Sequence, residues 1–369
     1  MIIVLKAGTK AAQRDRILSI IHDFGYKTHL SEGEQRTIIG VIGDEEKLRS
    51  LPLEALPGVE RVMPILKPYK LASRDFRHAD SVVTVNGVPL GGNRVVVIAG
   101  PCAVESRETL HATAAAVKRA GAQWLRGGAF KPRTSPYSFQ GLGEEGLKML
   151  REAGDEHGLP VVTEVMDTRD VALVERYTDV FQIGARNMQN FNLLSEVGRA
   201  KKPVILKRGM AATVSELLLS AEYILTRGNK NVILCERGIK SFEDSVRNLA
   251  DISAIPNVQG ASHLPVIFDP SHSTGRRELV LPMSRAAIAA GASGLLVDVH
   301  PHPDKAKCDG PQALLPDAFA RLMDEVRAVA RAIGREIADA PAESAPRRRK
   351  APHAVPTNTA KSKRKTVRG

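Results

Sequence analysis

The chain has 369 residues, 43% of them hydrophobic, which is enough for a large barrel domain and a smaller accessory domain. No apolar run approaches the roughly 18 residues of a membrane span, and the N-terminus lacks a basic leader with a cleavage site, so we expect no membrane segment and no secretory signal. The three cysteines are an odd number in a long chain, which favours a reducing cytoplasm over a disulfide framework.

The first 66 residues predict strand, helix, strand, strand, helix and strand in that order. Strands are expected at 2–6, 26–32, 36–43 and 59–66, and helices at 10–25 and 44–51. The first helix has Ile17 and Ile21 at helical spacing and stops at Gly25, and the second opens with acids. This βαββαβ order predicts a ferredoxin-like domain, a motif that by itself says little about function.

Residues 67–94 predict a linker followed by a hairpin that turns at Asn86-Gly87. From residue 95 onward eight short apolar runs recur about every 28 residues. They are 95–100, 124–130, 160–165, 180–185, 203–208, 232–237, 265–270 and 294–299. Amphipathic stretches separate the runs, so we expect an α/β fold with parallel strands. A doubly wound open sheet is an alternative, but eight units of this size favour a closed (β/α)8 TIM barrel over residues 95–338.

Nearly every run ends in a charged or reactive side chain, at the face where such barrels carry their active sites. The cations at these ends are Arg126, Lys131, Arg133, Arg186, Lys207, Arg208 and Arg237. Pairing with Glu164, Glu236 and Asp269 would neutralise only part of this charge. We therefore expect small, strongly anionic substrates that carry two phosphate groups. Arginine suits such substrates because its guanidinium group can donate two parallel hydrogen bonds to phosphate or carboxylate oxygens. No glycine-rich nucleotide loop follows a strand.

A second set of strand-end residues predicts a metal site. Cys102, His272, Asp298 and Asp309 combine thiolate, imidazole and carboxylate donors, which suit Mn, Fe, Co or Zn better than Mg or Ca. No characteristic ligand spacing links the four. His300 and His302 therefore remain alternative ligands, and Cys102 alone has the alternative of a small buried apolar residue.

Several motifs together resemble a known family over about residues 1–335. They include IAGPCAVES, RGGAFKPRTSPYSFQGLG, QIGARNMQNF, DPSHSTGRRELV and VHPHPDKAKCDGPQAL. The chain is similar to 3-deoxy-D-arabino-heptulosonate 7-phosphate synthases that have an N-terminal ferredoxin-like domain. The resemblance implies condensation of phosphoenolpyruvate with erythrose 4-phosphate, the first step of the shikimate route to aromatic amino acids.

The resemblance also implies residue roles, carried over motif by motif. It makes Cys102, His272, Asp298 and Asp309 the metal ligands, and Arg126, Arg186, Lys207 and Arg237 the phosphoenolpyruvate clamp. Lys131, Arg133, Thr134 and Ser135 become the erythrose-phosphate loop, with Lys131, Cys102 and His272 as catalytic residues. Phe130 and Phe139 are expected to pack the base of the loop. Whether Glu164 or the metal activates the attacking water stays open.

Two positions depart from the family pattern. Asp298 stands where the family usually has Glu, and this shorter carboxylate predicts a weaker or altered metal preference. Cys308 stands where serine is more usual, next to the ligand position Asp309. If the loop brings Cys308 near Cys102, oxidation would join the two and expel the metal.

The resemblance makes the N-terminal domain a regulatory domain that senses tyrosine or phenylalanine in a homo-oligomer, a tetramer by resemblance. A plain oligomer contact is the alternative. Residues 341–369 contain nine Lys and Arg and one acid, so they supply +8 of the net charge of +12. We expect 339–369 to be a disordered tail with at most non-specific nucleic-acid contacts. Competing functions are a 3-deoxy-D-manno-octulosonate 8-phosphate synthase, disfavoured by the KPRTS loop, and a nucleic-acid-binding protein.

Overall fold

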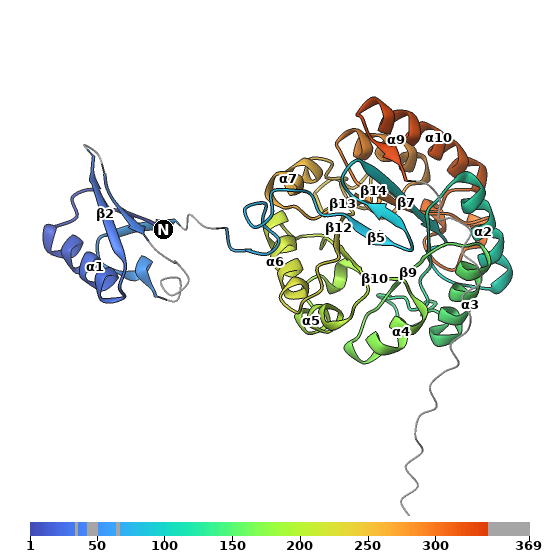
Figure 1. Ribbon diagram of the computed structural model, residues 1–369, viewed down its shortest axis with the longest axis horizontal. Coiled ribbons are helices and arrows are strands. Elements are labelled where there is room, and N and C mark those ends of the chain that lie inside the picture. Colours follow the sequence, from blue (N-terminus) through green and yellow to red (C-terminus); the bar gives the residue numbers. More distant parts are fainter. Residues whose placement is uncertain (34–35, 43–50, 64–66, 339–369) are drawn as a thin grey trace, which may run out of the picture.

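The computed structural model describes residues 1–33, 36–42, 51–63 and 67–338 and contains an N-terminal domain and a barrel (Figure 1). The N-terminal sheet has the order β2-β3-β1-β4, and the neighbouring strands run antiparallel. Its elements are β1 (Ile2–Leu5), α1 (Ala11–Asp23), β2 (Lys27–Glu32), β3 (Thr37–Ile42) and β4 (Val59–Met63). Ile17 and Ile21 of α1 pack on Ile3 and Ile39 of the sheet. The predicted ferredoxin-like domain is confirmed, and its predicted second helix lies almost entirely outside the described residues.

The second domain is the predicted eight-stranded barrel. Its strands are β7 (Arg94–Gly100), β8 (Trp124–Arg126), β9 (Val161–Glu164), β10 (Val180–Ile183), β11 (Val204–Lys207), β12 (Val232–Glu236), β13 (Val266–Phe268) and β14 (Gly294–Asp298). Each strand pairs in parallel with the next, and β14 pairs with β7 from Gly294 opposite Val96 to Asp298 opposite Gly100. This closing pair excludes the open-sheet alternative.

Helices surround the barrel, as Figure 1 shows. They are α2 (Arg107–Ala120), α3 (Gly143–Glu156), α4 (Val171–Tyr177), α5 (Phe191–Arg199), α6 (Val214–Leu225), α7 (Ala254–Ala261), α8 (Pro270–Thr274), α9 (Arg277–Ala289) and α10 (Pro316–Ala332). Some of their starts are capped by side chains: Ser106 accepts from the backbone of α2, and Thr213 and Glu216 form a reciprocal capping box on α6. A short strand β15 (Glu336–Ile337) adds to the N-terminal end of β7.

Alternate side chains of the strands face two different cores. Outward residues such as Val97 and Phe181 pack against the helices. Inward residues such as Ile98, Trp124 and Ile205 fill the barrel interior. Because side chains alternate along a strand, the next inward position lies two residues further towards the C-terminal end of the strand. The residues at these positions form the mouth of the barrel.

A hairpin closes the opposite end of the barrel. It consists of β5 (Val83–Val85) and β6 (Val88–Leu90), and its turn residues Asn86 and Gly87 both have positive φ. All three hairpin valines and Leu90 belong to the same core as the inward barrel residues. The barrel interior is therefore a packed apolar plug at its N-terminal end and polar only at its C-terminal mouth.

Two further expectations concern the C-terminal tail and membrane-spanning segments. The predicted basic tail, 339–369, lies outside the described residues. Among the described helices, none combines the length and the apolar character needed to cross a membrane.

The interior packing predicts a large stability difference between two matched substitutions. Ile205→Ala, at a fully buried inward position, should lower the unfolding free energy by about 2–5 kcal/mol because it leaves a cavity. Ile333→Ala, at an exposed position after α10, should cost less than about 1 kcal/mol. Urea unfolding followed by the fluorescence of Trp124, the single tryptophan, measures both. Equal midpoints for the two variants would contradict the packed-interior description.

Candidate active site

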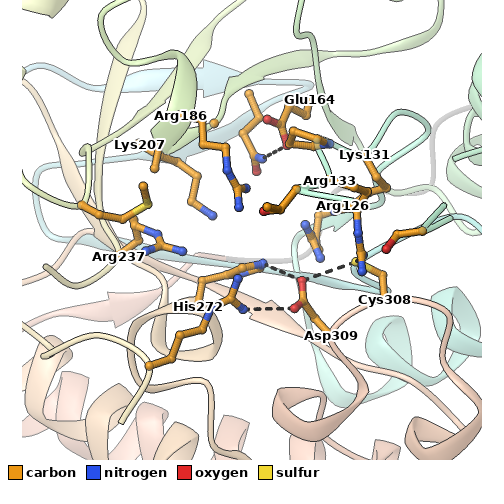
Figure 2. A pocket seen from close by; sticks show the side chains of 18 of the residues that line it. Arg126, Lys131, Arg133, Glu164, Arg186, Lys207, Arg237, His272, Cys308 and Asp309 are labelled. Carbon is orange, nitrogen blue, oxygen red and sulfur yellow. Dashed lines mark hydrogen bonds and ion pairs between the residues drawn. The ribbon is translucent and has the colours of Figure 1, made fainter. Parts of the chain in front are cut away.

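A cavity of about 300 Å³ opens at the C-terminal ends of the barrel strands (Figure 2). Of the predicted site residues, it is lined by Arg126, Lys131, Arg133, Thr134, Ser135, Arg186, Lys207, Arg237, His272 and Asp309. Cys102 and Asp298 lie buried beside it, in contact with Lys131 and Arg126 respectively. The structure thus brings together residues that are spread over more than two hundred positions of the sequence.

Asp269 organises one wall of this cavity. It follows β13, caps α8 by accepting from the backbone N–H of His272 at 2.9 Å, and forms ion pairs with Lys207 and with His272 Nδ1. Burial opposes the charge on His272, but Asp269 and Asp298 raise its pKa to about 10. Burial also opposes the charge on Asp269, but His272 and Lys207 hold its pKa well below the usual range. The His272 imidazole and the Asp269 carboxylate are therefore both charged at neutral pH.

Two buried arginines still have hydrogen-bonding capacity. Nε of Arg126 and both Nε and Nη1 of Arg237 lack a hydrogen-bond partner among the described residues. Burial lowers the pKa of Arg237, although nearby acids act in the opposite direction. Unpaired buried N–H groups are costly, so their presence at a cavity indicates a site for anionic oxygens. In Figure 2 Arg186, Lys207 and Arg237 point into the space that Arg126 and Lys131 face from the other side.

The loop 130–141 forms the rim of the cavity and is pinched at its base. Phe130 pairs with Gly141, where a Cβ would lie 2.1 Å from the carbonyl oxygen of Ala129, so the close approach requires glycine. Thr134 and Ser135 are exposed at the outer part of the loop. Phe130 packs against the barrel core and Phe139 against the buried cysteines, as predicted.

The predicted metal ligands form a compact group of donor atoms. Cys102 Sγ lies 3.2 Å from Asp309 Oδ2 and 3.9 Å from His272 Nε2, and Asp309 Oδ2 lies 3.7 Å from His272 Nε2. His272 Nε2 is also 3.7 Å from Asp298 Oδ2. Asp309 has a φ of 52°, a left-handed conformation that aspartate tolerates better than most residues. Together these donors could coordinate a divalent ion.

Cys308 belongs to the same group. Its Sγ lies 3.6 Å from Cys102 Sγ and 3.4 Å from Asp309 Oδ2, and both thiols are free. The two cysteines therefore lie as close together as the disulfide hypothesis requires. Their oxidation stays a prediction.

Two further strand-end residues lie outside the site: Arg208, which was predicted at the mouth of the barrel, and the alternative ligand His300. Arg208 does not line the cavity but pairs with Glu236 at 2.7 Å and with Asp251 at 2.8 Å. It follows Lys207 directly, so strand alternation turns it outward. His300 Nε2 lies 3.7 Å from Glu105 rather than among the grouped donor atoms.

Three site residues were missed by the sequence analysis. Arg247 donates to Asp309 Oδ1 at 3.0 Å, Gln312 donates to Asp298 Oδ2 at 2.8 Å, and Gln182 donates to Glu164 Oε2 at 3.3 Å. Arg247 lies in an irregular loop and Gln312 in the short 3₁₀ helix Gly310–Gln312, so neither has a periodic sequence signal. Gln182 had a usable signal, because it is a polar residue at an inward position of β10.

Comparison with known proteins relates both domains to one group of enzymes. Residues 80–332 match the DAHP synthetase I family, and residues 1–67 match the DAHP synthase ferredoxin-like domain. A phospho-2-dehydro-3-deoxyheptonate aldolase from Thermotoga maritima is 51% identical over 334 residues, 90% of this chain and 99% of that protein. The crystal structure of such a T. maritima enzyme superposes with a TM-score of 0.85 at 50% identity, covering 91% and 98% of the two chains. A 2-dehydro-3-deoxyphosphooctonate aldolase from Magnetococcus marinus is 32% identical over 68% of this chain and 92% of its own.

The Asp269 network predicts the protonation of His272. Asp269→Asn removes the nearest negative charge, so the pKa of His272 should fall from about 10 towards about 6.5, the ordinary histidine value. The imidazole would then be neutral at pH 8, where it is charged in the parent protein. An NMR titration of the ring in chelator-treated protein measures this, with Asp167→Asn, at a half-buried position outside the cavity lining, as control. An unchanged His272 pKa would contradict the network.

Proposed function

The chain belongs to the DAHP synthetase I family, and on that premise we propose that it condenses phosphoenolpyruvate with D-erythrose 4-phosphate and water. The products are 3-deoxy-D-arabino-heptulosonate 7-phosphate and phosphate, which makes the chain a 3-deoxy-7-phosphoheptulonate synthase. Family membership places the reaction at the entry to the shikimate pathway of aromatic amino acid biosynthesis.

One observation supports this proposal above the others: buried guanidinium groups with unpartnered N–H groups and a sulfur-containing donor cluster face the same cavity. The guanidinium groups require anionic partners, and the donor cluster suits a divalent ion. A reaction between two phosphorylated molecules needs both, because their mutual repulsion must be offset while an aldehyde is made reactive.

We assign the two substrates to two depths of the cavity. Arg126, Lys207 and Arg237 are almost fully buried, so with the less buried Arg186 they form the deeper site, for phosphoenolpyruvate. Arg133, Thr134 and Ser135 lie further out on the loop 130–141 and form the site for erythrose 4-phosphate. The more distant similarity to octulosonate-phosphate enzymes leaves arabinose 5-phosphate as the alternative aldose, against which the KPRTS sequence of the loop counts.

We further propose that a divalent ion is bound by Cys102, His272 and Asp309, with the Asp298 carboxylate beside His272. The residues present fit such an ion, because soft and hard donors converge within 3.9 Å of one another. When bound, the ion supplies Lewis-acid polarisation of the aldehyde oxygen.

Side chains of the protein then account for the remaining requirements. The carbon–carbon bond joins C3 of phosphoenolpyruvate to the aldehyde carbon, water adds to C2, and the phosphate leaves from C2. Lys131 is buried between Cys102 and the cavity, and Cys102, Cys308 and Glu164 raise its pKa although burial opposes its charge. We assign it the stabilisation of the charge that develops on the aldehyde oxygen. Glu164, which Gln182 holds at the cavity wall, is the carboxylate we assign to the attacking water.

The proposal also assigns a regulatory role to the N-terminal domain. We infer that it binds an aromatic amino acid, tyrosine or phenylalanine, and inhibits the barrel when it does so. We infer also that the chain forms a homo-oligomer, a tetramer by resemblance, which light scattering measures.

The unpaired nitrogens of Arg237 predict a substrate-specific defect. Arg237→Met should raise KM for phosphoenolpyruvate by about ten- to a hundredfold, because one charge-assisted bond contributes about 1.5–3 kcal/mol. Arg133→Ala should instead raise KM for erythrose 4-phosphate. Steady-state assays of phosphate release distinguish the two, and arabinose 5-phosphate should release little phosphate with the parent protein. Equal effects of both variants on both substrates would refute the assigned depths.

The regulatory assignment predicts that inhibition and catalysis are separable. A chain without residues 1–66 should keep phosphate release within about an order of magnitude, because the barrel contains its own core and the whole cavity. The same chain should lose inhibition by tyrosine and phenylalanine. Inhibition curves of the full and shortened chains measure this, and intact feedback inhibition in the shortened chain would refute the regulatory role.

A further inference from the structure

We propose that Cys308 is a ligand of the bound ion, so that two thiolates, one imidazole and one carboxylate coordinate it. The four ligands are Cys102, Cys308, His272 and Asp309, and the aldehyde oxygen that the ion polarises would enter as a fifth. This inference rests on the proposed function, because it concerns the ion that the proposed site holds.

Cys308 is buried although it lies in a loop. It stands between two short 3₁₀ helices, Pro303–Lys305 and Gly310–Gln312, and is 5% exposed on the wall of the cavity. Its sulfur contacts the Cys102 sulfur, a carboxylate oxygen of Asp309 and Nη1 of Arg133. Because these neighbours are polar or metal-binding, hydrophobic packing alone does not account for the position of the thiol.

Of the six separations among the four donor atoms, the five that do not join Cys308 to His272 fit the edges of a tetrahedron. A tetrahedral ion with sulfur at about 2.3 Å and nitrogen or oxygen at about 2.1 Å requires sulfurs about 3.8 Å apart and the other pairs at about 3.4–3.6 Å. The structure has 3.6 Å between the sulfurs of Cys102 and Cys308, and 3.2 Å and 3.4 Å from these sulfurs to Asp309 Oδ2. His272 Nε2 lies 3.9 Å from the Cys102 sulfur and 3.7 Å from Asp309 Oδ2. All five separations lie within about 0.4 Å of the requirement.

Asp298 is less suited to be the fourth ligand, because both of its carboxylate oxygens are already bound. Arg126 donates to Oδ1, and Gln312 donates to Oδ2 at 2.8 Å. Its backbone N–H is held by Ser271 Oγ at 3.0 Å, so the residue is fixed in this position. Its role is therefore to position Arg126 under the phosphoenolpyruvate site, and Cys308 takes the place among the ligands.

Nearby cations make two thiolates acceptable in one site. Two thiolates and one carboxylate carry one more negative charge than a divalent ion offsets. Each of these donors has a cation beside it: Lys131 at 3.1 Å from Cys102, Arg133 at 2.8 Å from Cys308, and Arg247 at 3.0 Å from Asp309. A site with two sulfurs selects zinc or ferrous iron over manganese, which prefers oxygen ligands.

Counting the sulfur ligands tests the proposal without any assay of activity. The full-length chain is loaded with zinc, and X-ray absorption at the zinc edge gives the number of Zn–S bonds. We expect two in the parent protein, one in Cys308→Ser and one in Cys102→Ser. Cys235→Ala removes the third thiol, which lies in the barrel interior, and should leave the count at two.

The outcomes separate this inference from the proposed function. A count of one in the parent protein, or an unchanged count in Cys308→Ser, overturns the role of Cys308 and leaves the proposed ion site in place. A parent protein that binds no zinc overturns both. If Cys308→Ser does not fold, the parent count alone decides.

A second measurement uses the same variants. Cobalt-loaded protein absorbs in the near ultraviolet through thiolate-to-cobalt charge transfer, and this band should lose about half of its intensity in Cys308→Ser. Competition between zinc and manganese should shift towards manganese by about tenfold or more in that variant. A band of unchanged intensity, or an unchanged preference, counts against a second thiolate.

Discussion

In the strands of a barrel every second side chain points inward, and this alternation is the constraint on which the site depends. The lower inward positions hold Ile98, Trp124 and Ile205, and the same rows continue upward into charged residues such as Arg126 and Lys207. A charged group removed from water is costly unless it is paired. Arg126 and Lys207 are accordingly paired with Asp298 and Asp269, which are carboxylates at the ends of other strands.

Neighbouring residues show how strictly alternation assigns roles. Lys207 and Arg208 are both cations at the end of β11, yet Lys207 faces the cavity and Arg208 pairs outside it with Glu236 and Asp251. A positive charge at position 207 therefore faces the cavity, whereas a positive charge at position 208 holds the loop that contains Asp251. At Asp269, in contrast, one carboxylate has three roles: it caps a helix, orients the imidazole of His272 and pairs with Lys207.

Much of this was predictable from the sequence, because the signals are periodic. The eight apolar runs gave the barrel, and polar residues at their ends gave the walls of the cavity. Periodicity could not predict the path of the segments between strands and α-helices: Arg247 and Gln312 have no sequence pattern that places them beside Asp309 and Asp298. The outward orientation of Arg208 could have been predicted from the alternation of side chains along the strand. The contact between Cys308 and Cys102 was stated only as a requirement of the disulfide hypothesis.

The hairpin that seals the lower end of the barrel has a consequence for the order of events. With that end packed by Val83, Val85 and Leu90, whatever reaches the cavity must arrive and depart through the upper mouth. A substrate bound by the deep arginines is then covered by a substrate bound by the loop above it. With the substrate depths assigned above, the substrate bound by the deep arginines therefore has to enter before the substrate bound by the loop.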